Sequence, residues 1–110
     1  MWMILTEGIE YKLSDDADRY LEKKKKKDNK VYRRLLKKID AITKDPYAFE
    51  YLSSNGKWRK ARTGDYRILF SVSHKLDENG NPNFDDPYCY ILLIEKRAKS
   101  YKSFNRKFKN

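Results

Sequence analysis

The stretch WRKARTGDYRILFSV, residues 58–72, carries the clearest strand pattern in this chain of 110 residues. From position 66 onward, apolar side chains recur at every second position, which is typical of a strand with one buried face. The apolar positions on that face are Ile68, Phe70 and Val72. Thr63-Gly64-Asp65 predicts a turn, and the basic residues after Trp58 predict a strand before it. The stretch therefore predicts two strands joined by a turn.

Two helices are predicted upstream of these strands. Ser14 and Asp15 offer N-caps, acids occupy the first turn, and a lysine run at 23–27 closes the first helix, in agreement with the helix dipole. Asp28-Asn29 separates it from a second helix, which ends at Asp45-Pro46. The apolar stripe of the second helix consists of Val31, Leu35, Ile39 and Ile42. This spacing predicts a helical hairpin packed on a sheet.

The remaining elements are strands and a basic tail. Residues 2–5 predict a short first strand, which the alternation at 9–13 extends or follows. Residues 75–87 are polar and predict a long hairpin tip, whereas Tyr88 to Ile94 is apolar on both faces and predicts a central strand. The predicted fold is α+β, with an N-terminal strand and a helical hairpin packed on a curved, mostly antiparallel sheet of about four strands. We expect one domain over residues 1–110, with residues 102–110 as a basic tail.

The charge of the chain indicates its class of partner. There are 26 Lys and Arg against 16 Asp and Glu, a formal net charge of +10. Such an excess favours a polyanionic partner, and nucleic acid is the usual one. The sequence has no run of about 18 apolar residues, so no membrane span is predicted. A single cysteine excludes an intramolecular disulfide. We therefore expect a cytoplasmic protein with no membrane partner.

Most standard catalytic constellations are missing from the sequence. The one histidine, His74, lies at a predicted strand end and is interpreted as a surface or turn residue in preference to a catalytic one. Cys89 lies inside the predicted central strand, where burial as a small hydrophobic residue is favoured. The acids near Asp86 are interpreted as a solvated loop in preference to a metal site. We expect no metal and no small-molecule cofactor.

Arg67 is the most informative basic residue, because it lies within the strongest predicted strand. It shares the face opposite the apolar stripe with Leu69 and Ser71. A buried arginine needs an anionic partner, and Asp65 is close enough in sequence to supply one. The alternative is that the guanidinium is presented to phosphate on an open sheet face. The sequence leaves these two roles open.

A second basic cluster follows the last predicted strand. Arg97 and Tyr101 are four residues apart, so a helix there would place both on one face. Lys96 and Lys99 add charge around them. The alternative interpretation is a solvated basic tail.

The strand around Arg67 and the basic cluster around Arg97 both resemble segments of a known family. Residues 58–70 resemble the W-R-x-R-x-G-D-Y-R-I-x-Y signature of RelE/ParE-superfamily toxins of type II toxin–antitoxin systems. The segment around Arg97 and Tyr101 is similar to the family's closing pattern, and the resemblance covers roughly residues 15–104. It implies an mRNA interferase, a ribosome-dependent endoribonuclease that inhibits translation by cutting mRNA in the A site. It also implies that Arg67, Arg97 and Tyr101 are catalytic.

The implied reaction is attack of a 2′-hydroxyl on the adjacent phosphorus without a metal, with arginines stabilising the phosphate charge and Tyr101 or a lysine moving a proton. The implied RNA-binding residues are Lys57, Lys60, Arg62, Tyr66, Lys96 and Lys99. Of these, Tyr66 is also a candidate for stacking on a splayed base. The implied partners are a cognate acidic antitoxin, the ribosome and mRNA. Two alternatives stay open, a ParE-like gyrase inhibitor of the same fold and a non-catalytic RNA- or ribosome-binding module.

The chain also departs from the family pattern. One residue more lies between Trp58 and Arg67 than in the commonest spacing, which predicts a β-bulge there. Glu95-Lys96 stands where the family has His or Gly-Lys, so no catalytic histidine precedes Arg97.

Overall fold

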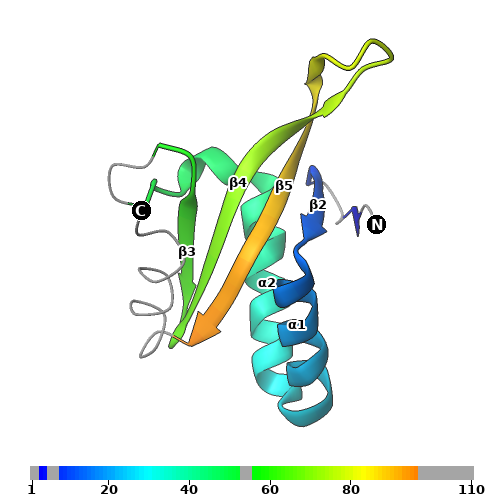
Figure 1. Ribbon diagram of the computed structural model, residues 1–110. Coiled ribbons are helices and arrows are strands. Elements are labelled where there is room, and N and C mark those ends of the chain that lie inside the picture. Colours follow the sequence, from blue (N-terminus) through cyan, green and yellow to red (C-terminus); the bar gives the residue numbers. More distant parts are fainter. Residues whose placement is uncertain (1–2, 5–7, 53–55, 97–110) are drawn as a thin grey trace, which may run out of the picture.

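A computed structural model describes residues 3–4, 8–52 and 56–96 (Figure 1). Two short strands come first, two helices and a 3₁₀ turn follow, and three strands complete the described chain. In chain order these elements are β1 (Met3–Ile4), β2 (Glu10–Leu13), α1 (Asp15–Lys27), α2 (Asn29–Lys44), η1 (Pro46–Ala48), β3 (Arg59–Thr63), β4 (Tyr66–Leu76) and β5 (Pro82–Lys96).

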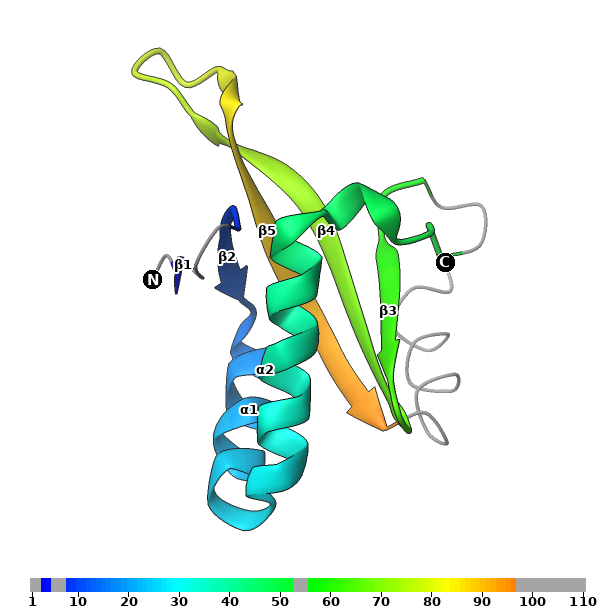
Figure 2. The ribbon, with the colours of Figure 1, turned by 180° about the vertical axis from the view of Figure 1, so that it is seen from behind.

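The strands form one mixed sheet in the order β1-β2-β5-β4-β3. The pair β2–β5 is parallel and every other pair is antiparallel. The predicted α+β architecture and the mostly antiparallel sheet are therefore confirmed, and β5 is central as predicted. Both helices cover the same face of the sheet (Figure 2). The opposite side of the sheet is called the open face below.

The helix boundaries follow their local sequence signals. The Ser14 hydroxyl accepts a hydrogen bond from the Ala17 amide at 3.0 Å, and acids in the first turn and lysines in the last complement the dipole. The Asp28 carboxylate caps α2 through the Val31 amide. The predicted break at Asp28-Asn29 and the predicted end at Asp45 are both confirmed.

The core lies between the helices and the sheet. From α2, the side chains of Leu35, Ile39 and Ile42 are fully buried. They pack in one cluster with Ile68 and Phe70 of β4, as the two apolar periodicities predict. The helical hairpin and the sheet thus share a single hydrophobic core.

The hairpin predicted at residues 75–87 is present, but its loop is shorter than predicted. β4 continues to Leu76 and β5 begins at Pro82, so the two strands form an arm with a tight turn (Figure 1). The Asp77 carboxylate accepts hydrogen bonds from the amides of Asn79 and Asn81, which satisfies the turn locally. Polar composition alone could not distinguish a solvated strand pair from a loop.

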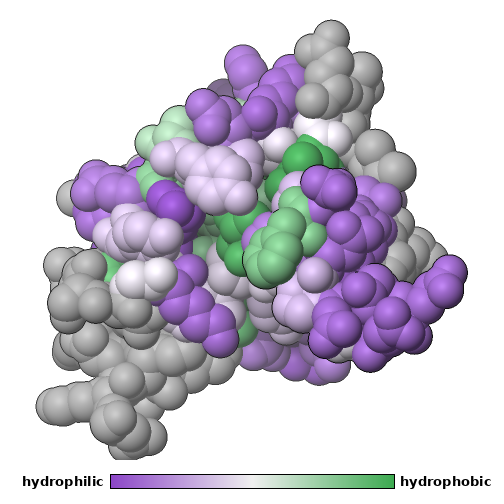
Figure 3. Space-filling model, turned by 90° about the horizontal axis from the view of Figure 1, so that it is seen from above, coloured by the Kyte–Doolittle hydropathy of each residue, from purple (hydrophilic) through white to green (hydrophobic). Residues whose placement is uncertain are grey.

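The arm leaves apolar side chains in solvent. Leu76 is 67% exposed and Phe84 is 75% exposed, with the Phe84 ring 5.0 Å from that of His74. The view from above the arm shows hydrophobic side chains gathered between hydrophilic ones (Figure 3).

The bulge predicted between Trp58 and Arg67 is also wrong. β3 and β4 pair without a register shift from Arg59↔Phe70 to Thr63↔Tyr66. The turn between them has Gly64 at φ +59°, a conformation that glycine adopts without strain.

A bulge occurs instead in β5. Leu69 pairs with Leu93 but Phe70 pairs with Ile91, so Leu92 is the extra residue. Beyond Leu92 the alternation is reversed, which turns Leu93 to the open face and Ile94 to the core.

Candidate nucleic-acid interface

The open face brings together basic and aromatic side chains from several described strands. Strand alternation and register place side chains of β2, β3, β4 and β5 there. They include Glu10 and Lys12 from β2, Trp58, Lys60 and Arg62 from β3 and its approach, Arg67, Leu69, Ser71 and Ser73 from β4, and Tyr88, Tyr90, Leu93 and Glu95 from β5.

Two predicted RNA-binding residues, Lys60 and Arg62, and the predicted catalytic residue Arg67 are neighbours on this face. Lys60 pairs with Leu69 and Arg62 pairs with Arg67 across β3 and β4. Arg62 is exposed and Lys60 is half-buried. Two cations at the solvent boundary of a sheet form a favourable position for a phosphate group.

Arg67 lies on the open face but is only 3% exposed. The residue directly opposite it on β5 is Glu95. The carboxylate brought next to Arg67 by strand pairing is therefore Glu95, whereas the sequence offered Asp65. An acid in this position offsets the cost of burying a guanidinium.

Aromatic rings lie beside the basic group. The rings of Trp58 and Tyr90 are 6.5 Å apart and inclined at 48°, and Lys57 Nζ lies 5.2 Å from the Trp58 ring centre. Both rings are half-buried, so part of each is accessible. Half-buried rings on an open sheet can stack on unpaired bases. Sequence reasoning did not select Trp58 or Tyr90, because their proximity depends on the register of three strands.

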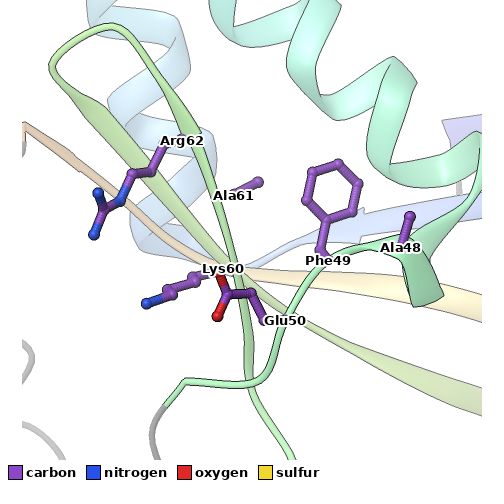
Figure 4. A pocket seen from close by; sticks show the side chains of 6 residues that line it. All are labelled: Ala48, Phe49, Glu50, Lys60, Ala61 and Arg62. Atoms are coloured by element: carbon purple, nitrogen blue, oxygen red, sulfur yellow. The ribbon is translucent and has the colours of Figure 1, made fainter.

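The edge of the open face is hollowed next to β3. A cavity of about 330 Å³ is lined by Ala48, Phe49, Glu50, Lys60, Ala61 and Arg62. Figure 4 shows the Lys60 and Arg62 side chains extending to the same side, away from the Phe49 ring, with Glu50 next to Lys60. The cavity joins two cations and one carboxylate at the sheet edge.

Tyr66 does not lie on the open face. It pairs with Thr63 and Lys96, is 6% exposed, and belongs to the core beneath the helices. Lys24 Nζ of α1 lies 5.6 Å from its ring centre. This placement corrects the expectation that Tyr66 stacks on a base, since its ring already packs in the core. Lys96 ends β5 and is exposed.

The other predicted catalytic and RNA-binding residues, Arg97, Lys99 and Tyr101, lie outside the described residues. Lys57 is exposed next to Trp58. The described part of the site therefore consists of the β3–β4 cations and the neighbouring rings.

Cys89 and His74, the two other residues considered for chemistry, have the packing of structural residues. Cys89 is fully buried, as predicted, and burial raises the pKa of its thiol to about 12. His74 is half-buried against Phe84.

Over residues 3–4, 8–52 and 56–96, no group of three or more His, Cys, Asp and Glu side chains is arranged to hold a metal ion. Neither described helix has the length and apolar character to cross a membrane.

The fold and this face define an α+β domain with an open sheet that is basic and aromatic. No protein family, curated protein or solved structure was found to match the chain.

Proposed function

We propose that the protein binds single-stranded RNA through the open face and is a RelE-type toxin, a ribosome-dependent mRNA endoribonuclease. The observation that carries the RNA-binding part is the grouping of Lys60 and Arg62 next to the rings of Trp58 and Tyr90. Cations attract phosphates, and rings stack on bases whatever their sequence. The endoribonuclease part rests on the resemblance of residues 58–70 and of the segment around Arg97 to that family.

In the proposed reaction, RNA phosphates lie along Lys60 and Arg62, and a base stacks against the aromatic pair. The 2′-hydroxyl loses a proton and attacks the adjacent phosphorus, which forms a 2′,3′-cyclic phosphate and releases the 5′-oxygen. Arg97 stabilises the developing charge on the phosphate and Tyr101 transfers a proton. Arg67, being buried opposite Glu95, holds the sheet beneath the RNA.

The burial of Arg67 favours a second candidate, a non-catalytic RNA- or ribosome-binding protein. An arginine that is 3% exposed must move before it can contact a scissile phosphate. In this second candidate function Arg67 and Glu95 stabilise the sheet, and the exposed cations provide affinity alone.

The proposed partners follow from the charge. A net charge of +10 suits an acidic antitoxin that neutralises the open face, as well as ribosomal RNA and mRNA in the cytoplasm.

The test compares wild type with three double variants in a cell-free translation system, reading mRNA cleavage by primer extension and RNA affinity by titration. Lys60→Gln/Arg62→Gln should reduce both affinity and cleavage. Arg97→Ala/Tyr101→Phe should abolish cleavage. The matched control is Lys25→Gln/Lys26→Gln, because both lysines are exposed on α1 and the charge change is equal.

Each outcome selects one function. RNA binding without cleavage by wild type would support the non-catalytic candidate. Gyrase-dependent DNA breaks with intact mRNA would support the ParE-like alternative. Equal loss of RNA affinity in the Lys60/Arg62 variant and the control would refute the open face as the binding surface.

A further inference from the structure

We infer that a second pocket, on the helix side of the β3 edge, is a binding site for a phosphate group. The pocket has a volume of about 380 Å³ and is lined by Arg34, Lys37, Lys38, Ala41, Thr63 and Gly64. It combines one face of α2 with the β3–β4 turn. It is separate from the open face, to which none of these six residues contributes a side chain.

The cations of this pocket share one helical stripe. Positions 34, 37, 38 and 41 follow the i, i+3, i+4, i+7 spacing, so their side chains lie together on α2. Ala41, the smallest of the four, leaves room beside the three charged residues. Arg34 and Lys38 are a like-charge i, i+4 pair, which by itself destabilises a helix slightly. An anion bound between them removes that repulsion.

No nearby acid compensates the positive charge of this pocket among the residues that line it. The one carboxylate on α2, Asp40, forms a salt bridge with Lys44 at 3.1 Å. Among the described residues that line the pocket there is no acid. Asp65 follows Gly64 in the turn, but it is exposed and does not line the pocket.

The turn holds Arg34 against the pocket wall. A methyl group built at Gly64 would lie 2.8 Å from Arg34 Nη1, so the guanidinium packs directly on the turn. Gly64 has φ +59°, and the absence of a side chain leaves space for Arg34. Thr63, a half-buried residue of the same wall, has a hydroxyl that can act as a neutral donor. A guanidinium fork, two ammonium groups and a hydroxyl are donors that suit phosphate oxygens.

The location suggests how an RNA strand would reach the pocket. Arg62 belongs to the sheet-edge cavity and the next residue, Thr63, belongs to this pocket. A strand bound on the open face would therefore pass the β3 edge and place a following phosphate between Arg34 and Lys37. This route rests on the proposed RNA binding, whereas phosphate recognition itself does not.

The first experiment uses inorganic phosphate and amide NMR of the full chain at constant pH and ionic strength, with chloride as the compensating anion. The amides of Thr63 and Gly64 should shift saturably in wild type and in Lys25→Gln/Lys26→Gln, and not in Arg34→Gln/Lys37→Gln. These four side chains are exposed, so both variants should keep the wild-type melting temperature. Unshifted amides in wild type, or equal shifts in both double variants, would overturn the site.

The second experiment identifies the source of the phosphate. It measures the affinity for a single-stranded RNA 12-mer against salt concentration. If the pocket takes an RNA phosphate, Arg34→Gln/Lys37→Gln should lower the slope of log K against log salt by about 0.7 for each RNA phosphate that is no longer neutralised, while the control keeps the wild-type slope. NMR shifts with an unchanged slope would assign the site to free phosphate. Absence of RNA binding in wild type would refute the proposed function and leave the NMR result intact.

Discussion

Ser14 links the first helix to the β5 bulge, and its replacement tests how the two are coupled. Its hydroxyl accepts from the Ala17 amide at 3.0 Å and donates to the Leu92 carbonyl at 2.6 Å. Its own amide donates to the Ile91 carbonyl at 2.9 Å. One hydroxyl therefore caps α1 and satisfies the carbonyl of the extra bulge residue.

Removing the hydroxyl by Ser14→Ala costs two interactions. Loss of an N-cap costs about 1 kcal/mol. Leaving the partly buried Leu92 carbonyl without this donor costs a further ~1 kcal/mol, the low end for an unsatisfied buried group. We expect a decrease of about 2 kcal/mol in the free energy of unfolding. For a domain of this size, that is a decrease of roughly 10 °C in the melting temperature.

Two further replacements separate the roles. Ser14→Asp keeps an oxygen that caps α1, but a carboxylate cannot donate to the Leu92 carbonyl and is repelled by it. Ser14→Thr keeps both functions and serves as the control. Urea denaturation followed by circular dichroism should rank stability as wild type and Thr, then Asp and Ala. A decrease of less than about 0.5 kcal/mol for Ser14→Ala would refute the coupling, because it is the size expected of an ordinary surface substitution. So would an Asp variant as stable as wild type.

Three more predictions concern packing, titration and stacking. A methyl group at Gly8 would lie 2.8 Å from Cβ and 3.1 Å from the carbonyl carbon of buried Thr43, so Gly8→Ala should cost about 1–3 kcal/mol in urea denaturation, and a wild-type midpoint would contradict that close approach. Burial holds the pKa of the Cys89 thiol at about 12, so an unfolded chain loses that proton at a lower pH. Stability from this group is full below about pH 8.5 and falls as pH rises toward 12, by at most about 1.4 kcal/mol per unit, and Cys89→Ala should lack this component in pH-dependent unfolding. Trp58→Ala should weaken binding of single-stranded RNA by about 1–3 kcal/mol with an unchanged salt slope, whereas a changed slope would assign Trp58 an indirect role through Lys57.

The helices and the main strand could be predicted because their signals are local. A cap, a dipole-matched charge pattern and an apolar stripe all lie within one element, as at Ser14 and along the stripe from Leu35 to Ile42. The extent of the strands in the 75–87 hairpin was missed for the opposite reason. Beyond His74↔Pro87 the pairing shifts register and only Leu76↔Pro82 follows, so these solvated strand ends leave no apolar periodicity in the sequence.

The candidate site was predictable only in part. Lys60 and Arg62, which the resemblance implies as RNA-binding residues, lie on one face because they alternate along β3. The position of Tyr66 was also predictable, since it shares its parity with Ile68 and Phe70 and so had to face the core. Trp58 and Tyr90 could not be paired without the strand register.

The partner of Arg67 depends on a single inserted residue. With regular pairing from Phe70↔Ile91 onward, Arg67 would oppose Ile94, and Glu95 would oppose Tyr66 on the core side. The extra residue Leu92 shifts this register by one, so Glu95 opposes Arg67 on the open face while Ile94 enters the core. A charge mismatch on both faces is thereby avoided, because an unpaired buried guanidinium and a carboxylate among apolar side chains are each costly.

The dependence of the Arg67 partner on the Leu92 bulge connects the Ser14 cap of α1 to the open face. The Ser14 hydroxyl binds the carbonyl of the residue that creates the register shift, and the Ser14 amide binds the carbonyl just before it. A bulge whose backbone groups are satisfied by a helix cap is fixed in position, so Glu95 stays opposite Arg67. The buried Arg67 and the half-buried Glu95 in turn support the strands that carry Arg62 and Lys60 at the surface. The start of α1 thus controls, through β5, the geometry of the face to which we assign RNA binding.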